Sequence, residues 1–193
     1  MHKVELKQFI QANIPTSEQI VLQIGEQFDA YTILKNEFFL KEGKLSNEYL
    51  FLVTGFMRSF TLDTEGNEVT TYFYSANGVV FEVSSFFLRS ISTESIQALT
   101  DCTGYTITYE KLNFLFHSIP EFREFGRKIL VQEFAAFKQR TLSLIHKSAE
   151  TRYAELLQNN QDVFQHAPLK YIASYLGITD TSLSRIRKEF AKK

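Results

Sequence analysis

Apolar and polar residues follow three different periods along this chain. The apolar positions of residues 4–10 recur at near-helical spacing. Beyond them Thr16 is followed three residues later by Gln19, a capping-box pattern that predicts a second helix beginning at Thr16. Two N-terminal helices are therefore expected.

From about Lys35 to Tyr109 the pattern changes to short apolar runs bounded by turn residues. The segment DTEGNE, residues 63–68, is a hairpin signal between two of these runs. The strands predicted from the runs span residues 49–53, 56–62, 69–74, 95–99 and 105–109. Many short strands punctuated by turns are typical of a β-sandwich or a closed roll.

A helical period returns after Pro120 and continues to about Ser148. This segment carries two apolar stripes, and one helix cannot bury both against a single surface. The first stripe has spacings of four and three, which are typical of a two-stranded coiled coil with a second copy, and it predicts the dimerisation residues Leu130, Phe134, Phe137, Thr141 and Leu144. The second stripe would face the β-rich region and contains Phe122, Phe125, Ile129 and Ala136. The alternative is a helix buried entirely within one monomer.

After a short helix in ETRYAELLQNN and a loop over residues 161–167, the chain carries two closely joined helical segments. Pro168 suits a helix start, because its missing N–H would be unpaired there. Ala173 and, four residues later, Gly177 allow a close helix crossing and a tight turn. Leu183 and Ile186 would face back onto the first helix. This spacing predicts a helix-turn-helix.

The outward side of the second segment carries hydroxyl and cationic groups. One helix of this kind fits the major groove, which is about 12 Å wide, and an arginine can donate two hydrogen bonds to a guanine. Arg187, Lys192 and Lys193 would add salt-sensitive attraction to phosphates. The predicted partner is double-stranded DNA, and the residues predicted to contact it are Thr179, Thr181, Ser182, Ser184, Arg185 and Lys188.

Charge is distributed unevenly along the chain. The chain of 193 residues has a net charge of −1, but residues 168–193 hold six Lys and Arg against two acids, which is +4 and leaves −5 for the rest. A basic segment on an acidic body favours a polyanionic partner.

Cysteine, histidine and hydropathy exclude several classes of protein. Cys102 is the only cysteine, so an intrachain disulfide, a zinc finger and a cysteine-ligated cluster are excluded within one chain. The four histidines are scattered and suggest no metal or haem ligand set. No apolar run approaches the roughly 18–20 residues of a membrane span. We therefore expect a cytoplasmic protein without metal or cofactor.

The order of these parts, with the stretches KNEFFLKEGKLSNEYLFLVTGFMRSFTLDTEGNEVTTYFY, FEVSSFFLRSISTESIQALTDC, ETRYAELLQ and PLKYIASYLGITDTSLSRIRKEF, resembles the cyclic-AMP receptor/fumarate-nitrate regulator superfamily. Gly55, Arg58 and Phe60 match the family's G-x-x-R-x-F. The resemblance implies an α+β fold: a double-stranded β-helix (a jelly roll like a cyclic nucleotide-binding domain) over 1–118, a dimerisation helix over 119–148, and a winged helix-turn-helix over 149–193. It also implies a homodimeric, sequence-specific regulator, with RNA polymerase as a further partner.

The family's cyclic-nucleotide site is only partly present. The resemblance implies a Gly-Glu pair followed about ten residues later by Arg and Ser or Thr, but here the pair is Phe81-Glu82 and the later position has no Arg. A buried phosphate would then lack its counter-charge, so we expect that cyclic AMP is not the effector. Another polar effector, unidentified, remains one alternative, with candidate contacts Glu82, Ser84, Ser85, Arg89, Ser92 and Thr93. A roll without any ligand is the other.

Two further hypotheses compete with a DNA-binding regulator. One is a small-molecule-binding module that acts through protein contacts, against which the +4 charge of the last segment argues. The other is an enzyme on a β-roll, which would need clustered histidines and carboxylates. Between Lys35 and Tyr109 there is no histidine, and the chain shows no phosphate-binding loop or dinucleotide fingerprint. We therefore expect no enzymatic activity.

Overall fold

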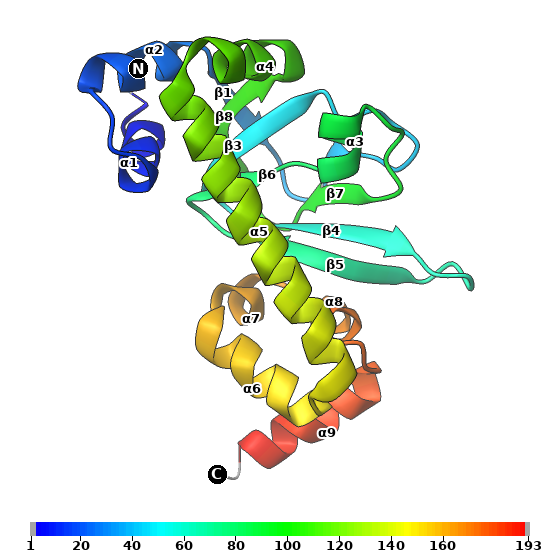
Figure 1. Cartoon of the computed structure of the whole chain (residues 1–193). Coiled ribbons are helices and arrows are strands. Elements are labelled where there is room, and N and C mark those ends of the chain that lie inside the picture. The colour runs from blue at the N-terminus through cyan, green and yellow to red at the C-terminus, as the bar shows by residue number, and fades with distance from the viewer. Residues whose placement is uncertain (1–2, 192–193) are drawn as a thin grey trace.

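The computed structural model describes residues 3–191, and its N-terminal half is a roll of two antiparallel sheets (Figure 1). One four-stranded sheet has the order β1-β8-β3-β6 and the other the order β2-β7-β4-β5. The strands are β1 (Asp29–Ile33), β2 (Phe38–Leu40), β3 (Glu48–Thr54), β4 (Met57–Leu62), β5 (Glu68–Tyr74), β6 (Gly78–Val80), β7 (Ser95–Ala98) and β8 (Cys102–Thr108).

The sequence located the longer strands but not the shorter ones. The predicted strands over 49–53, 56–62, 69–74 and 95–99 coincide with β3, β4, β5 and β7, and 105–109 overlaps β8. The hairpin is also confirmed, since β4 pairs with β5 across the turn in which Asp63 accepts hydrogen bonds from two backbone N–H groups. Strands β1, β2 and β6 were not predicted, because three to five residues carry too little periodicity.

The N-terminal helices are α1 (Val4–Asn13) and α2 (Glu18–Glu26). The expected cap at Thr16 is wrong by one residue, because the Ser17 hydroxyl accepts the hydrogen bond from the backbone N–H of Ile20. Val21 and Ile24 of α2 are buried against the roll. The roll also carries α3 (Val83–Leu88) between β6 and β7, and α4 (Tyr109–Ser118) after β8.

Helix α5 (Pro120–His146) joins the roll to the C-terminal helices and runs along the molecule in Figure 1. Its first turns are buried in the roll core through Phe122, Phe125 and Ile129. Ala136, which was predicted to continue this stripe, is exposed because α5 has by then left the core. The alternative of a helix buried entirely within one monomer does not hold for the C-terminal half of α5, where Phe134 and Phe137 are exposed.

The C-terminal helices are α6 (Ala149–Asn159), α7 (Asp162–His166), α8 (Leu169–Tyr175) and α9 (Asp180–Phe190). Residues 161–167, predicted as a loop, therefore contain a one-turn helix around the buried Val163. The wing implied by the resemblance is not observed between residues 147 and 191, which contain no strand.

One cluster of buried residues is shared by the roll and the C-terminal helices. Phe56, Phe73 and Leu99 of the roll pack with Ile172, Leu176 and other buried residues of α6–α9. Helix α8 lies against β5. The orientation of the C-terminal helices is thus fixed by packing on the second sheet.

Candidate DNA-recognition helix, dimer surface and effector region

The turn between α8 and α9 has the geometry that the sequence predicted. Gly177 has a φ of +65°, and the backbone N–H groups of Gly177 and Ile178 donate to the carbonyls of Ser174 and Ala173. This is a Schellman cap, which ends a helix with a left-handed residue. A side chain at Gly177 would be strained by the positive φ and would also begin 3.2 Å from Leu144 Cδ2 of α5.

Helix α9 is amphipathic and keeps its polar face outward. The Thr179 side chain caps the helix by accepting from the backbone N–H of Ser182 at 3.2 Å. Leu183 and Ile186 are buried against the other C-terminal helices. The exposed residues of the predicted DNA face are Thr179, Thr181, Ser184, Arg185 and Lys188.

The other residues predicted to face DNA are Ser182, Arg187, Lys192 and Lys193. The Ser182 hydroxyl accepts a hydrogen bond from Thr179 Oγ1 at 3.0 Å and is half-buried, so it belongs to the cap at least as much as to the outer face. Lys192 and Lys193 lie outside the described residues. Arg187 is exposed on α9.

The predicted dimer stripe is only partly satisfied within one chain. Leu130 packs against the roll core, whereas Phe134 and Phe137 are 68% and 62% exposed. Thr141 and Leu144 are also exposed. The sequence did not single out Val131 and Ile145, which extend the exposed apolar surface. Exposed apolar surfaces of this kind are typical of interaction sites.

A buried arginine connects the roll to the C-terminal helices. Arg58 of β4 is fully buried; it pairs with Glu68 and donates to Gln97 Oε1 at 3.2 Å. Its guanidinium lies between two rings, 4.1 Å from the centroid of Phe60 and 3.3 Å from that of Tyr171 on α8. Such stacking suits the planar, delocalised cation of arginine.

Two more contacts hold α8 on the roll beside this arginine. Ser174 Oγ donates to Thr70 Oγ1 and accepts from the Thr70 backbone N–H, both at 3.1 Å. From α5, Arg140 Nη2 donates to the Tyr175 carbonyl at 3.0 Å. The position of α8, and through it that of α9, is therefore set by both the second sheet and α5.

Most of the candidate effector residues are already hydrogen-bonded within the protein. Glu82 caps α3, where its carboxylate accepts from the backbone N–H groups of Ser84, at 3.1 Å, and Ser85. The buried Ser85 hydroxyl accepts from the Ser46 backbone N–H at 2.7 Å. Of Glu82, Ser84 and Ser85, only Ser84 is exposed, and its backbone N–H donates to Glu82.

Arg89 lies at the opposite end of α3 and does not point to an anion site. Its guanidinium donates to the Ser46 carbonyl at 2.9 Å and to Asn47 Oδ1 at 2.6 Å, and it lies 4.3 Å from the Tyr109 ring. The buried Ser92 hydroxyl bonds the backbone of Glu94, and Thr93 is exposed. The polar groups of Glu82, Ser85, Arg89 and Ser92 are therefore already used within the protein.

Carboxylates gather on the side of the roll that faces α5. Burial raises the pKa of Glu94, and Glu82 adds to the rise, whereas Arg140 opposes it. Glu133 of α5 accepts a hydrogen bond from the Tyr72 hydroxyl at 2.9 Å. The sequence did not mark Glu94 or Glu133 as site residues, because both belong to otherwise ordinary polar stretches.

We expect Glu94→Gln to stabilise the protein at neutral pH. A carboxyl whose pKa is raised by folding contributes stability below its unfolded pKa and loses it as pH rises through the folded value. The gain from the neutral amide should therefore be largest near pH 7 and vanish near pH 4. Urea unfolding at both pH values measures it, with the exposed Glu65→Gln as control. Equal effects of Glu94→Gln at both pH values would contradict the assignment.

Comparisons with known proteins agree with this architecture. Residues 31–118 match the family model described as "Cyclic nucleotide-binding domain". The chain is 25% identical over 172 residues to the fumarate and nitrate reduction regulatory protein of Vibrio cholerae, covering 83% of this chain and 68% of that protein. It is 25% identical over 171 residues to the transcriptional activator Anr of Pseudomonas protegens, covering 81% and 68%.

Solved structures share the fold. FixK2 from Bradyrhizobium japonicum superposes with a TM-score of 0.72 at 18% identity, covering 86% of this chain and 85% of that chain. The c-di-GMP-responsive regulator CLP of Xanthomonas campestris gives 0.71 at 14% identity, covering 91% and 92%.

A cyclic nucleotide-binding-like roll, a long connecting helix and a helix-turn-helix together form the architecture of a transcription regulator rather than that of an enzyme. The domain match and the relatives support a regulator of the CRP/FNR type. None of the helices within residues 3–191 has the length and apolarity needed to cross a membrane. Within the same residues, no group of three or more His, Cys, Asp and Glu side chains is placed to hold a metal ion.

Proposed function

We propose that two copies of this chain pair along α5 and bind a specific, roughly two-fold symmetric duplex through α9. The observation that supports this proposal is that one chain exposes two surfaces: the face of α9 that carries cationic and hydroxyl groups, and the aromatic stripe of α5. A dimer places two recognition helices in successive major grooves, about 34 Å apart. CRP/FNR-type relatives regulate transcription, which is consistent with this use.

The roll does not use cyclic AMP in this proposal. Phe81 precedes Glu82, where the family's site has glycine. The next arginine along the chain, Arg89, is bonded to Ser46 and Asn47. Glu94 and Glu133 add negative charge on the side that faces α5. A cyclic phosphate would therefore meet carboxylates instead of a counter-charge. Calorimetric titration with cyclic AMP tests this point, and saturable micromolar binding would contradict it.

DNA binding is tested without a known operator by selection from random duplexes. Enrichment of an inverted repeat with half-sites one helical turn apart is the expected result. The affinity for the selected duplex should fall steeply as salt rises, because phosphate contacts release counterions. A chain that acts only through protein contacts would enrich no sequence.

Arg185→Ala should weaken binding to the selected duplex by about 1–3 kcal/mol and relax the preference at one base pair of each half-site. The exposed position of Arg185 on the outer face of α9 is the reason. Lys188→Ala should weaken the binding of selected and random duplexes alike, and it should reduce the dependence of log affinity on log salt concentration by about one per half-site. Mobility shifts in a salt series measure both effects. The control is Lys44→Ala, which removes an exposed cation of the roll. If Arg185→Ala lowered the affinity for all duplexes equally, its role in base recognition would be wrong.

A further inference from the structure

A surface groove separate from the six effector candidates runs between α4 and α5, beside α3. Its volume is about 470 Å³, within the range of small-molecule sites. Phe87, Phe116 and Leu130 supply apolar walls. Its polar lining residues are Asn113, His117, Arg123 and Arg127, and none of the lining residues is a carboxylate.

The crossing of α4 and α5 depends on Gly126. A Cβ at this position would lie 2.5 Å from Cε1 of Phe116, so the Phe116 ring rests directly on the α5 backbone. The same ring lies 5.1 Å from Phe122, between the buried core and the groove. The groove floor is therefore a fixed aromatic surface.

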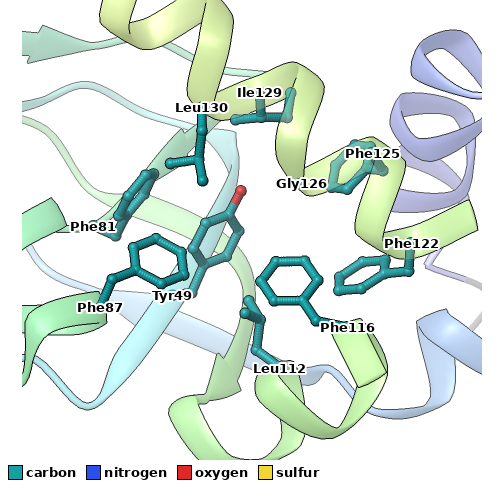
Figure 2. Close-up of a pocket in the computed structure, with 10 residues that line it drawn as sticks. All are labelled: Tyr49, Phe81, Phe87, Leu112, Phe116, Phe122, Phe125, Gly126, Ile129 and Leu130. Atoms are coloured by element: carbon teal, nitrogen blue, oxygen red, sulfur yellow. The ribbon is translucent and has the colours of Figure 1, made fainter. Parts of the chain in front are cut away.

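A smaller internal cavity adjoins the groove and contains an unpaired hydroxyl (Figure 2). It has a volume of about 10 Å³ and shares Phe87, Phe116, Gly126 and Leu130 with the groove. The Tyr49 side chain is only 7% exposed, and Figure 2 shows its hydroxyl pointing toward α5 near Leu130. Within residues 3–191 this hydroxyl has no hydrogen-bond partner. Burial raises the pKa of Tyr49, so the hydroxyl is a neutral donor that lacks an acceptor.

The edge of the groove is positively charged. Arg127 is paired with Glu124 at 2.8 Å, and His117 Nδ1 lies 2.7 Å from the Asn113 carbonyl. Arg123 uses Nε to donate to the Phe116 carbonyl at 3.2 Å. In the described part of the chain its two terminal nitrogens have no partner, so they can bind an anion.

A second copy of α5 fits this part of the helix poorly. Arg123, Arg127 and Leu130 precede Phe134 at spacings of four, three and four, so they lie on the same stripe. In a parallel pair of helices, Arg123 and Arg127 of one copy would face the same cations of the other. Like charges in contact disfavour pairing there, whereas an anion between them removes the repulsion.

We propose that this groove binds a small amphiphilic carboxylate. Its carboxylate lies on Arg123, its apolar body covers Phe116 and Leu130, and an uncharged oxygen at its inner end accepts from the Tyr49 hydroxyl. The regulatory consequence rests on the proposed dimer: a ligand that neutralises this end of the α5 stripe favours the paired state by its difference in affinity for the two states.

Calorimetric titration of the full chain, without DNA, tests the binding. The probes are octanoate, 8-hydroxyoctanoate and octylammonium, which share a chain length and differ in their ends. We expect 8-hydroxyoctanoate to bind most tightly and octylammonium not to bind. Arg123→Gln should lower the binding affinity of both carboxylates by about tenfold, because a charge-assisted hydrogen bond is lost. Lys138→Gln, which removes an exposed cation elsewhere on α5, should change nothing.

Tyr49→Phe tests the inner contact and keeps the ring that fills the core. It should abolish the advantage of 8-hydroxyoctanoate over octanoate and leave octanoate binding unchanged. The inference is overturned if octylammonium binds as well as octanoate, or if neither Arg123→Gln nor Tyr49→Phe changes the affinities. Because these titrations contain no DNA and apply equally to a monomer, they can fail while the proposed DNA binding holds, and the reverse.

Discussion

Arg58→Ala is expected to lower the free energy of unfolding by about 2–5 kcal/mol, the usual cost of truncating a long, fully buried side chain to alanine. Arg58 is fully buried against Glu68, Gln97 and the Tyr171 ring. Its removal leaves a cavity, whereas the Glu68 carboxylate is 40% exposed and its charge stays screened by solvent. Urea unfolding at pH 7 measures the loss.

Arg58→Lys separates the two parts of this effect. Lysine keeps the charge but has no planar group to stack between Phe60 and Tyr171, so we expect an intermediate loss. Arg127→Ala is the control, because an exposed i,i+3 ion pair contributes about 0.5 kcal/mol or less. Wild-type stability in Arg58→Ala would show that α8 does not depend on this contact.

The double variant Phe134→Asp, Phe137→Asp should weaken self-association by at least about a hundredfold. Two carboxylates on each copy would have to be buried against each other, at a cost of several kcal/mol, and tenfold in affinity corresponds to about 1.4 kcal/mol. Both side chains are exposed in the single chain, so its folding should be nearly unaffected. Sedimentation equilibrium measures the association.

Gln139→Asp is the matched control for this variant. It adds a carboxylate to the same helix, but two residues after Phe137 the helix has turned by about 200°, away from the stripe. We expect its association and its affinity for DNA to remain at the wild-type level. Unchanged association in the double variant would place the dimer surface elsewhere.

The sequence predicted those parts of the fold that depend on local pattern. The buried Leu183 and Ile186, the Gly177 turn and the Thr179 cap are determined by residues within about ten positions of one another. The one-turn helix α7 was missed because five residues give no usable periodicity. Ser17 replaced Thr16 as cap because neighbouring hydroxyl residues compete for the same helix start.

Contacts between distant segments could not be predicted in this way. Arg58 was recognised as part of a family pattern, but its stacking on Tyr171 joins residues 113 positions apart. The effector candidates were chosen by their order along the chain. Arg89 itself has a left-handed backbone conformation, which no local pattern predicts, and its guanidinium is bonded to Ser46 and Asn47. The DNA and dimer residues, and the boundaries at 118/119 and 148/149, stay predictions.

The most direct test of the central claim is the number of chains on one selected duplex, measured as the mass of the purified complex by light scattering. Two chains of 22.4 kDa on each duplex are expected for a pair joined along α5. A single chain per duplex, bound with full affinity and with Phe134 and Phe137 still open to solvent, would contradict the account.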